Sequence, residues 1–188
     1  MHKFAIMNRC LFFSLINFIF SFSLFSQGSS VLSSGDWYEF TTSQNGIYKL
    51  AYSDFQELGV STSNLKISDI KIYGNSGGML PELNSDFRHS DLIENAIQVY
   101  DLNNNGIFEN SDYILFYGTS ADDWIFNPST NLFNYHKHLY DDEVSYFLTI
   151  DSQSNGKRVV DKVHLANPNV TITTYNSYAH HEEDLINL

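Results

Sequence analysis

Short runs in which polar and apolar residues alternate make up much of the chain. Several are rich in β-branched and aromatic residues, and clusters of Gly, Asn and Asp separate them. The runs are Trp37–Thr41, Gly46–Leu50, Ile70–Tyr73, Ala96–Tyr100, Tyr113–Tyr117 and Val144–Ile150. Because a period of two places successive side chains on opposite faces of a strand, the pattern predicts a mainly β fold, either an antiparallel β-sandwich or a barrel-like domain.

Two short helices are expected to interrupt the strands. The first is predicted to start at Ser53, with Gln56 completing a capping box and Gly59 ending the helix. The second is predicted from Tyr178 to Leu188, where no Gly or Pro provides a stop signal. We therefore predict a β-rich domain over residues 27–177 and, over 178–188, the start of a further element that is cut short.

The N-terminus has the pattern of a secretory signal peptide. Lys3 and Arg9 precede an apolar run from Leu11 to Phe25 that several serines interrupt. A membrane span needs about 20 predominantly apolar residues, so a retained anchor is the less favoured alternative. We predict that residues 1–26 are removed, with cleavage near Gln27, and that the chain is exported to the periplasm, outer membrane or cell surface.

Removal of residues 1–26 would change the cysteine content and the net charge of the protein. The only cysteine, Cys10, lies in the segment predicted to be removed, so the mature chain would have no disulfide or thiol chemistry. The formal charge of −12 would become −14, because eight Lys and Arg would face 22 Asp and Glu. Such an acidic chain is a poor partner for nucleic acid, but its carboxylates could bind Ca²⁺ outside the cytoplasm.

The segment Asp101–Asp112 is the strongest metal-binding pattern in the sequence. It matches the calcium-loop spacing D-x-[DN]-x-[DN]-G, and oxygen ligands recur at positions nine and twelve. Gly106 would permit the sharp turn that such a loop needs. The predicted ligands are the side chains of Asp101, Asn103, Asn105, Glu109 and Asp112 and the backbone carbonyl of Ile107.

Two features of this segment depart from the pattern. Position twelve is Asp112, one methylene shorter than the usual bidentate Glu, and the flanking residues are predicted to form strands rather than helices. A hairpin connection built on Asn105-Gly106, which is a strong turn signal, accounts for the same residues. The sequence leaves both interpretations open.

Two further patterns that could bear chemistry have simpler explanations. Gly74–Gly78 imitates the nucleophile loop of trypsin-like proteases around Ser76, but the only preceding histidine is His2 in the predicted signal peptide. A glycine-rich turn after a strand is the better interpretation. His136 and His138 have the spacing of a metal pair on a strand, but surface histidines in a polar loop are the better interpretation.

Ordered blocks along the chain resemble the N-terminal region of the type IX secretion sortases, gingipain-family cysteine peptidases of Bacteroidetes. The blocks are Ser30–Tyr38, Gly46–Leu50, Ile72–Glu82, Asp112–Gly118, Tyr146–Thr149 and His181–Leu188.

The resemblance implies a cell-surface enzyme that removes the C-terminal sorting domain of secreted cargo and attaches the cargo to the surface. The family's catalytic histidine and cysteine lie in a later domain, so no catalytic residue carries over to this sequence. The implied partners are a downstream peptidase domain of the same chain, outer-membrane proteins of the attachment complex, and secreted cargo. This chain would then be a non-catalytic β-domain.

A function from another class remains open. The chain could be a free-standing, secreted, calcium-stabilised adhesion or glycan-binding module, since 15% of its residues are aromatic and could stack on sugars. Most of those aromatic residues fall in the predicted strands, where packing alone accounts for them.

Overall fold

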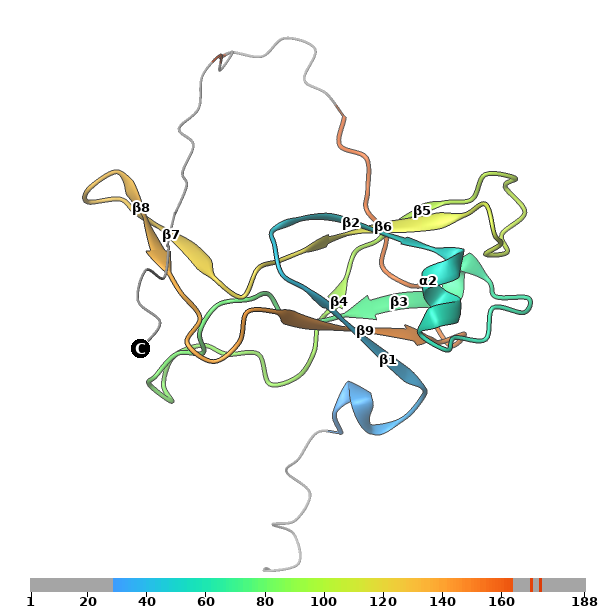
Figure 1. Cartoon of the computed structure of the whole chain (residues 1–188), viewed down its shortest axis with the longest axis horizontal. Helices are drawn as coiled ribbons and strands as arrows, with labels where there is room; N and C mark the ends of the chain where they lie inside the picture. Colours follow the sequence, from blue (N-terminus) through green and yellow to red (C-terminus); the bar gives the residue numbers. More distant parts are fainter. Residues whose placement is uncertain (1–28, 164–169, 171–172, 174–188) are drawn as a thin grey trace, which may run out of the picture. The chain divides into compact units, whose positions relative to one another are not determined.

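The computed structural model describes residues 29–163 together with residues 170 and 173. The chain divides into two units, residues 1–33 and residues 34–188. The described part of the first unit holds a single 3₁₀ turn, η2 (Val31–Ser33). The fold described below is that of the second unit (Figure 1). The predicted signal peptide and the predicted helix at 178–188 lie outside the described residues.

The second unit is built from antiparallel strands. They are β1 (Trp37–Thr42), β2 (Gly46–Ala51), β3 (Ile70–Tyr73), β4 (Glu94–Asn95), β5 (Gln98–Tyr100), β6 (Tyr113–Gly118), β7 (Asp123–Asn127), β8 (Leu132–His136) and β9 (Val144–Ile150). One sheet has the order β1-β9-β3-β4, a second has the order β2-β6-β5, and β7 pairs with β8 alone. The mainly β, antiparallel prediction is confirmed, and within the described residues the sheets do not close into a barrel.

The two larger sheets pack against each other through an aromatic core. Register places Phe40 of β1 opposite Tyr146 of β9, and both face the second sheet. The ring of Phe116 in β6 meets Phe40 edge-on at a centroid distance of 5.4 Å and Tyr146 at 5.2 Å. Ile72 and Leu148 are fully buried beside them. Each such side chain contributes about 1.5–3 kcal/mol by leaving water, so these residues join the sheets into one core.

The predicted strands are present with small shifts in their bounds, except at Ala96–Tyr100. That run was predicted to be one strand, but β5 begins only at Gln98. The chain crosses there from one sheet to the other, because β4 pairs with β3 whereas β5 pairs with β6. Strands β4, β7 and β8 were not predicted: β4 is only two residues long, and the apolar runs of the other two are short, with Asp123 and Asn127 at the ends of β7 and Asn134 inside β8.

The helix α2 (Tyr52–Glu57) lies close to its predicted position, but its predicted cap is wrong. Ala51, not Ser53, is the N-cap, and the carboxylate of Asp54 accepts the N–H of Ala51 at 2.7 Å. A carboxylate at the third helical position can satisfy this N–H from inside the helix, so a serine cap is not needed. Gly59 has a φ of +84°, which confirms it as the residue that ends the helix.

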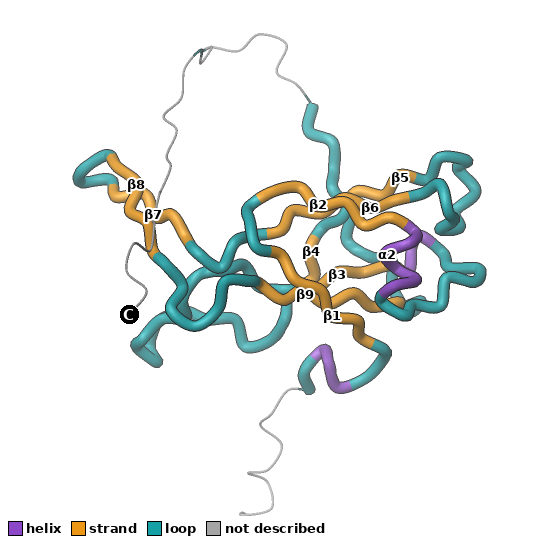
Figure 2. Tube along the Cα trace, viewed as in Figure 1, coloured by secondary structure: helices purple, strands orange, loops and turns teal. Residues whose placement is uncertain are grey.

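A hairpin of β7 and β8 forms a separate two-stranded sheet (Figure 2). The side chain of Asp122, just before β7, joins the start of the hairpin to its end. One oxygen accepts the hydroxyl of Tyr135, and the other accepts the N–H of His138 at 2.8 Å. Burial alone would raise the pKa of Asp122, but these hydrogen bonds outweigh it and lower the pKa.

No helix among the described residues is long and apolar enough to cross a membrane.

Candidate functional site

The predicted calcium loop connects β5 to β6 and is anchored at its C-terminal half. Phe108 is buried and packs on Phe55 of α2 at a centroid distance of 4.5 Å. Its N–H donates to the carbonyl of Leu65 at 2.7 Å. The helix and the loop therefore support each other.

Side chains of the predicted ligands hydrogen-bond the backbone of their own loop. The carboxylate of Asp101 accepts the N–H groups of Asn105 at 3.3 Å and Gly106 at 2.8 Å. The side-chain oxygen of Asn105 accepts the N–H of Ile107 at 2.8 Å. The amide of Asn103 donates to Glu109 at 2.6 Å. These bonds turn the polar side chains into the loop, as a turn built on Asn and Asp requires.

Asp112 closes the loop from inside the protein. It is 1% exposed, and its two oxygens accept the N–H of Leu102 at 3.0 Å and of Glu109 at 2.8 Å. A buried carboxylate needs such partners to offset the loss of water. The same bonds fix both ends of the loop to the start of β6.

The loop thus gathers the predicted ligands in one segment, but side-chain oxygens of Asp101, Asn105 and Asp112 accept backbone N–H groups. Among the residues that the structure describes, no group of three or more His, Cys, Asp or Glu side chains lies close enough to hold a metal ion. Calcium prefers six to eight oxygen ligands, and asparagine and backbone oxygens can supply some of them. Calcium binding by this loop stays a prediction.

Ser76 lies in the loop after β3, where the glycines serve close packing. The N–H of Gly77 donates to the hydroxyl of Thr119 at 2.9 Å, and the N–H of Gly78 donates to the carbonyl of Ala121 at 2.9 Å. These N–H groups are therefore not available to stabilise an oxyanion beside Ser76.

Ser76 and His89 both line a hollow of about 230 Å³. No hydrogen bond joins the two side chains in the described part of the chain, and His89 instead meets the ring of Phe87 edge-on at 4.9 Å. Of the two histidines with metal-pair spacing, His136 ends β8, and Nδ1 of His138 accepts the N–H of Asp141 at 2.9 Å. Neither arrangement supports hydrolysis or metal binding.

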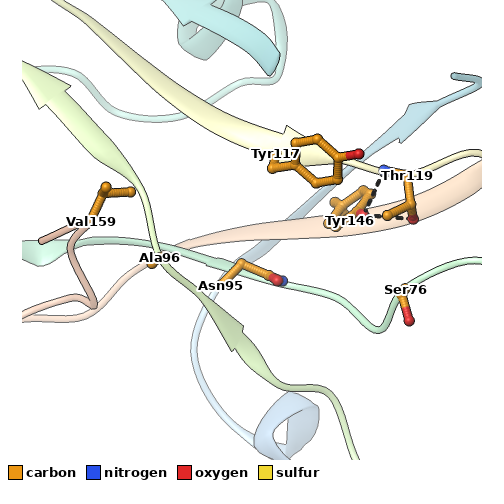
Figure 3. A pocket seen from close by; sticks show the side chains of 7 residues that line it. All are labelled: Ser76, Asn95, Ala96, Tyr117, Thr119, Tyr146 and Val159. Carbon is orange, nitrogen blue, oxygen red and sulfur yellow. Dashed lines mark hydrogen bonds between the residues drawn. The ribbon is translucent and has the colours of Figure 1, made fainter. Parts of the chain in front are cut away.

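A larger cavity, of about 440 Å³, opens where β6 parts from β4 and β5 (Figure 3). Its lining residues are Ser76, Asn95, Ala96, Tyr117, Thr119, Tyr146 and Val159. The hydroxyl of Tyr146 lies 3.1 Å from both the N–H and the hydroxyl of Thr119, which holds the phenol ring against the cavity wall. Tyr117, in contrast, is 60% exposed.

The cavity is lined by hydroxyl, amide and apolar groups, and no lining residue carries a formal charge. Such a lining can bind an uncharged polar ligand. Sequence reasoning singled out only Ser76 from this set. Ala96, Tyr117 and Tyr146 fell in predicted strands, and nothing in the local sequence of the lining residues signals a cavity.

No protein-family model and no curated protein matches the sequence. Among solved structures, the chain is similar to a crystal structure of dimeric latent PorU from Porphyromonas gingivalis, with a TM-score of 0.55. The match has 22% sequence identity and covers 76% of this chain and 12% of that chain. The chain thus shares its fold with part of PorU and corresponds to a small fraction of its length.

Proposed function

We propose that this chain is a non-catalytic β-domain of an exported protein of the type IX secretion sortase family. The observation that carries the proposal is the shared fold with part of PorU, together with the ordered sequence blocks that resemble the same family. PorU is such a sortase, and the matched part makes up 12% of its chain. By resemblance, the full-length protein is a cysteine-type endopeptidase that removes sorting domains from cargo and attaches cargo to the cell surface.

Under this proposal, the domain assists chemistry that takes place elsewhere in a longer protein. It supports the folding of a downstream peptidase domain, shields its cleft, or contacts outer-membrane proteins of the attachment complex.

The DNA that follows the codon of Leu188 provides the test. An open reading frame that continues into an α/β domain with a cysteine and a histidine would support the proposal. A stop codon directly after Leu188 would overturn it and favour a free-standing adhesion or glycan-binding module.

A further inference from the structure

Half of one edge of β6 has no neighbouring strand among the described residues. β6 is the central strand of its sheet and pairs along its whole length with β2. On the other side, β5 pairs only with Tyr113, Ile114 and Leu115. Residues 116–118 therefore lie beyond this pairing, and of these three Tyr117 lines the 440 Å³ cavity.

The hydrogen bonds of Ile97 show which way the unpaired backbone N–H and C=O groups of β6 point. Its N–H donates to the carbonyl of Lys157 at 3.2 Å, and its carbonyl accepts the N–H of Val159 at 3.0 Å. Backbone groups of successive strand residues point to opposite sides, so those of Gln98 point toward Leu115, its partner in β6. By the same alternation along β6, the N–H and C=O of Tyr117 point to the cavity side.

The next hydrogen-bonding pair of this ladder would be Ala96 and Tyr117, and it is not made. The pairing of β5 with β6 ends at Gln98 and Leu115, and both Ala96 and Tyr117 line the cavity. The cavity thus separates two strand edges that the rest of the ladder aligns. Sheets usually protect such an edge with charge, proline or a covering segment, and β6 carries neither charge nor proline.

We propose that the cavity is a binding site for an extended peptide segment, which adds as a short strand beside Tyr117. Main-chain hydrogen bonds to the open edge would supply affinity, and the small side chains of Ser76 and Ala96 leave room for small or β-branched side chains of the peptide. The cavity has no charge of its own, but the chain has a net charge of −12, so its field favours basic over acidic peptides. Neutral oligosaccharides are the competing ligand class.

The experiment is an NMR titration of the ¹⁵N-labelled chain with two probes. One is a set of end-blocked heptapeptides that alternate Thr, Ser or Val and carry one terminal Lys, and the other is a pair of neutral hexose oligomers, maltohexaose and cellohexaose. The amide of Tyr117 should exchange about tenfold more slowly with peptide present. The amide of Ile47, which lies opposite Tyr117 on β2 and away from the cavity, should not change.

Two variants test the site, so that the misfolding of one would not remove the test. Ala96→Phe fills the cavity, and Ser76→Lys places a positive charge at its exposed rim, so each should weaken binding of the basic peptides about tenfold or more. Ile47→Lys, on an exposed position outside the cavity, is the matched control and should bind as the wild type does. Unchanged exchange of Tyr117 up to millimolar peptide, or unchanged affinity in Ser76→Lys, would overturn the proposal. Protection by the oligosaccharides alone would overturn it in favour of a glycan site.

Discussion

At the residue scale, the glycine-rich loop after β3 is explained by packing. A Cβ atom on Gly77 would lie 1.8 Å from the carbonyl oxygen of Ser120, and one on Gly74 would lie 2.5 Å from the ring of Tyr146. The obstacle at Gly77 is backbone, which cannot rotate away. Glycine is therefore needed there because of its size, whatever the role of the neighbouring Ser76.

The first prediction follows from this contact. Gly77→Ala should lower the free energy of unfolding by about 2 kcal/mol or more, because the backbone of the loop must move to admit the methyl group. Gly46→Ala is the control, since a Cβ at that position meets nothing within 4 Å. Urea unfolding of both variants measures the difference. Equal stabilities would show that the loop accommodates a side chain.

A buried lysine provides the second residue-scale feature. Lys71 is 2% exposed, and its Nζ donates to Asp151 at 2.5 Å and to Ser154 at 2.7 Å. The bond from Lys71 lowers the pKa of Asp151, and the N–H of Gln153 adds to the effect. The pair ties the segment after β9 to β3.

The second prediction is a pH-dependent loss of stability in Asp151→Asn. Asp151 is 37% exposed, so we expect a loss of only about 1–2 kcal/mol at pH 6.5. A lowered folded pKa stabilises the protein above the unfolded value of about 3.9. That stabilisation disappears as the pH falls through the folded pKa, so variant and wild type should converge toward pH 2. Unfolding curves at both pH values provide the measurement, and a difference that does not change with pH would contradict the prediction.

At the scale of elements, the loop between β5 and β6 is where the calcium and hairpin interpretations meet. Its flanks are strands, as the hairpin interpretation expects, and Asn104 and Gly106 have positive φ values of +55° and +80°. Its polar side chains bond to their own backbone, which is compatible with either interpretation. Only a measurement with the ion distinguishes the two.

The third prediction is that Ca²⁺ stabilises the domain through this loop. At a hundredfold excess over Kd, binding to the folded state alone adds about 2.7 kcal/mol. Asp101→Ala should lose this increment, besides lowering the ion-free stability because two N–H groups lose their acceptor. Asn104→Gly keeps every predicted ligand and should retain the increment. If thermal unfolding of the wild type is indifferent to millimolar Ca²⁺ and to chelator, the hairpin interpretation is correct.

At the scale of the whole molecule, the fourth prediction is that the purified chain hydrolyses no peptide bond. Gingipain-type chemistry needs a thiolate beside an imidazole, and the single cysteine, Cys10, lies in the predicted signal peptide. A substrate that contains a sorting domain, incubated with and without reductant, is the assay. Cleavage that persists in Ser76→Ala would reveal a nucleophile elsewhere in the chain.

The fifth prediction concerns export. The mature protein should begin close to Gln27 and be found in the cell envelope, because the apolar run Leu11–Phe25 is shorter than a membrane span. N-terminal sequencing of protein from the envelope fraction tests this. An intact N-terminus at Met1 on membrane-embedded protein would instead indicate a retained anchor.

The sequence by itself determined the class of the fold and the position of its longer strands. Alternation of polar and apolar residues, as in Val144–Ile150, is a local property that depends only on which face of a strand is buried. The end of α2 at Gly59 was predictable for the same reason, because a left-handed residue is a local requirement. The loop at 101–112 was also located correctly between two strands.

Only the tertiary structure decided which strands pair and what lies between them. The crossing between β4 and β5, the contact of Gly77 with Ser120, and the bond from Lys71 to Asp151 all join residues that local patterns treat separately. The cavity beside Tyr117 exists because two ladders diverge at Ala96, which is a matter of register between distant segments. Strand preference indicates that a residue suits a sheet, but pairing is set by the packing of the whole core.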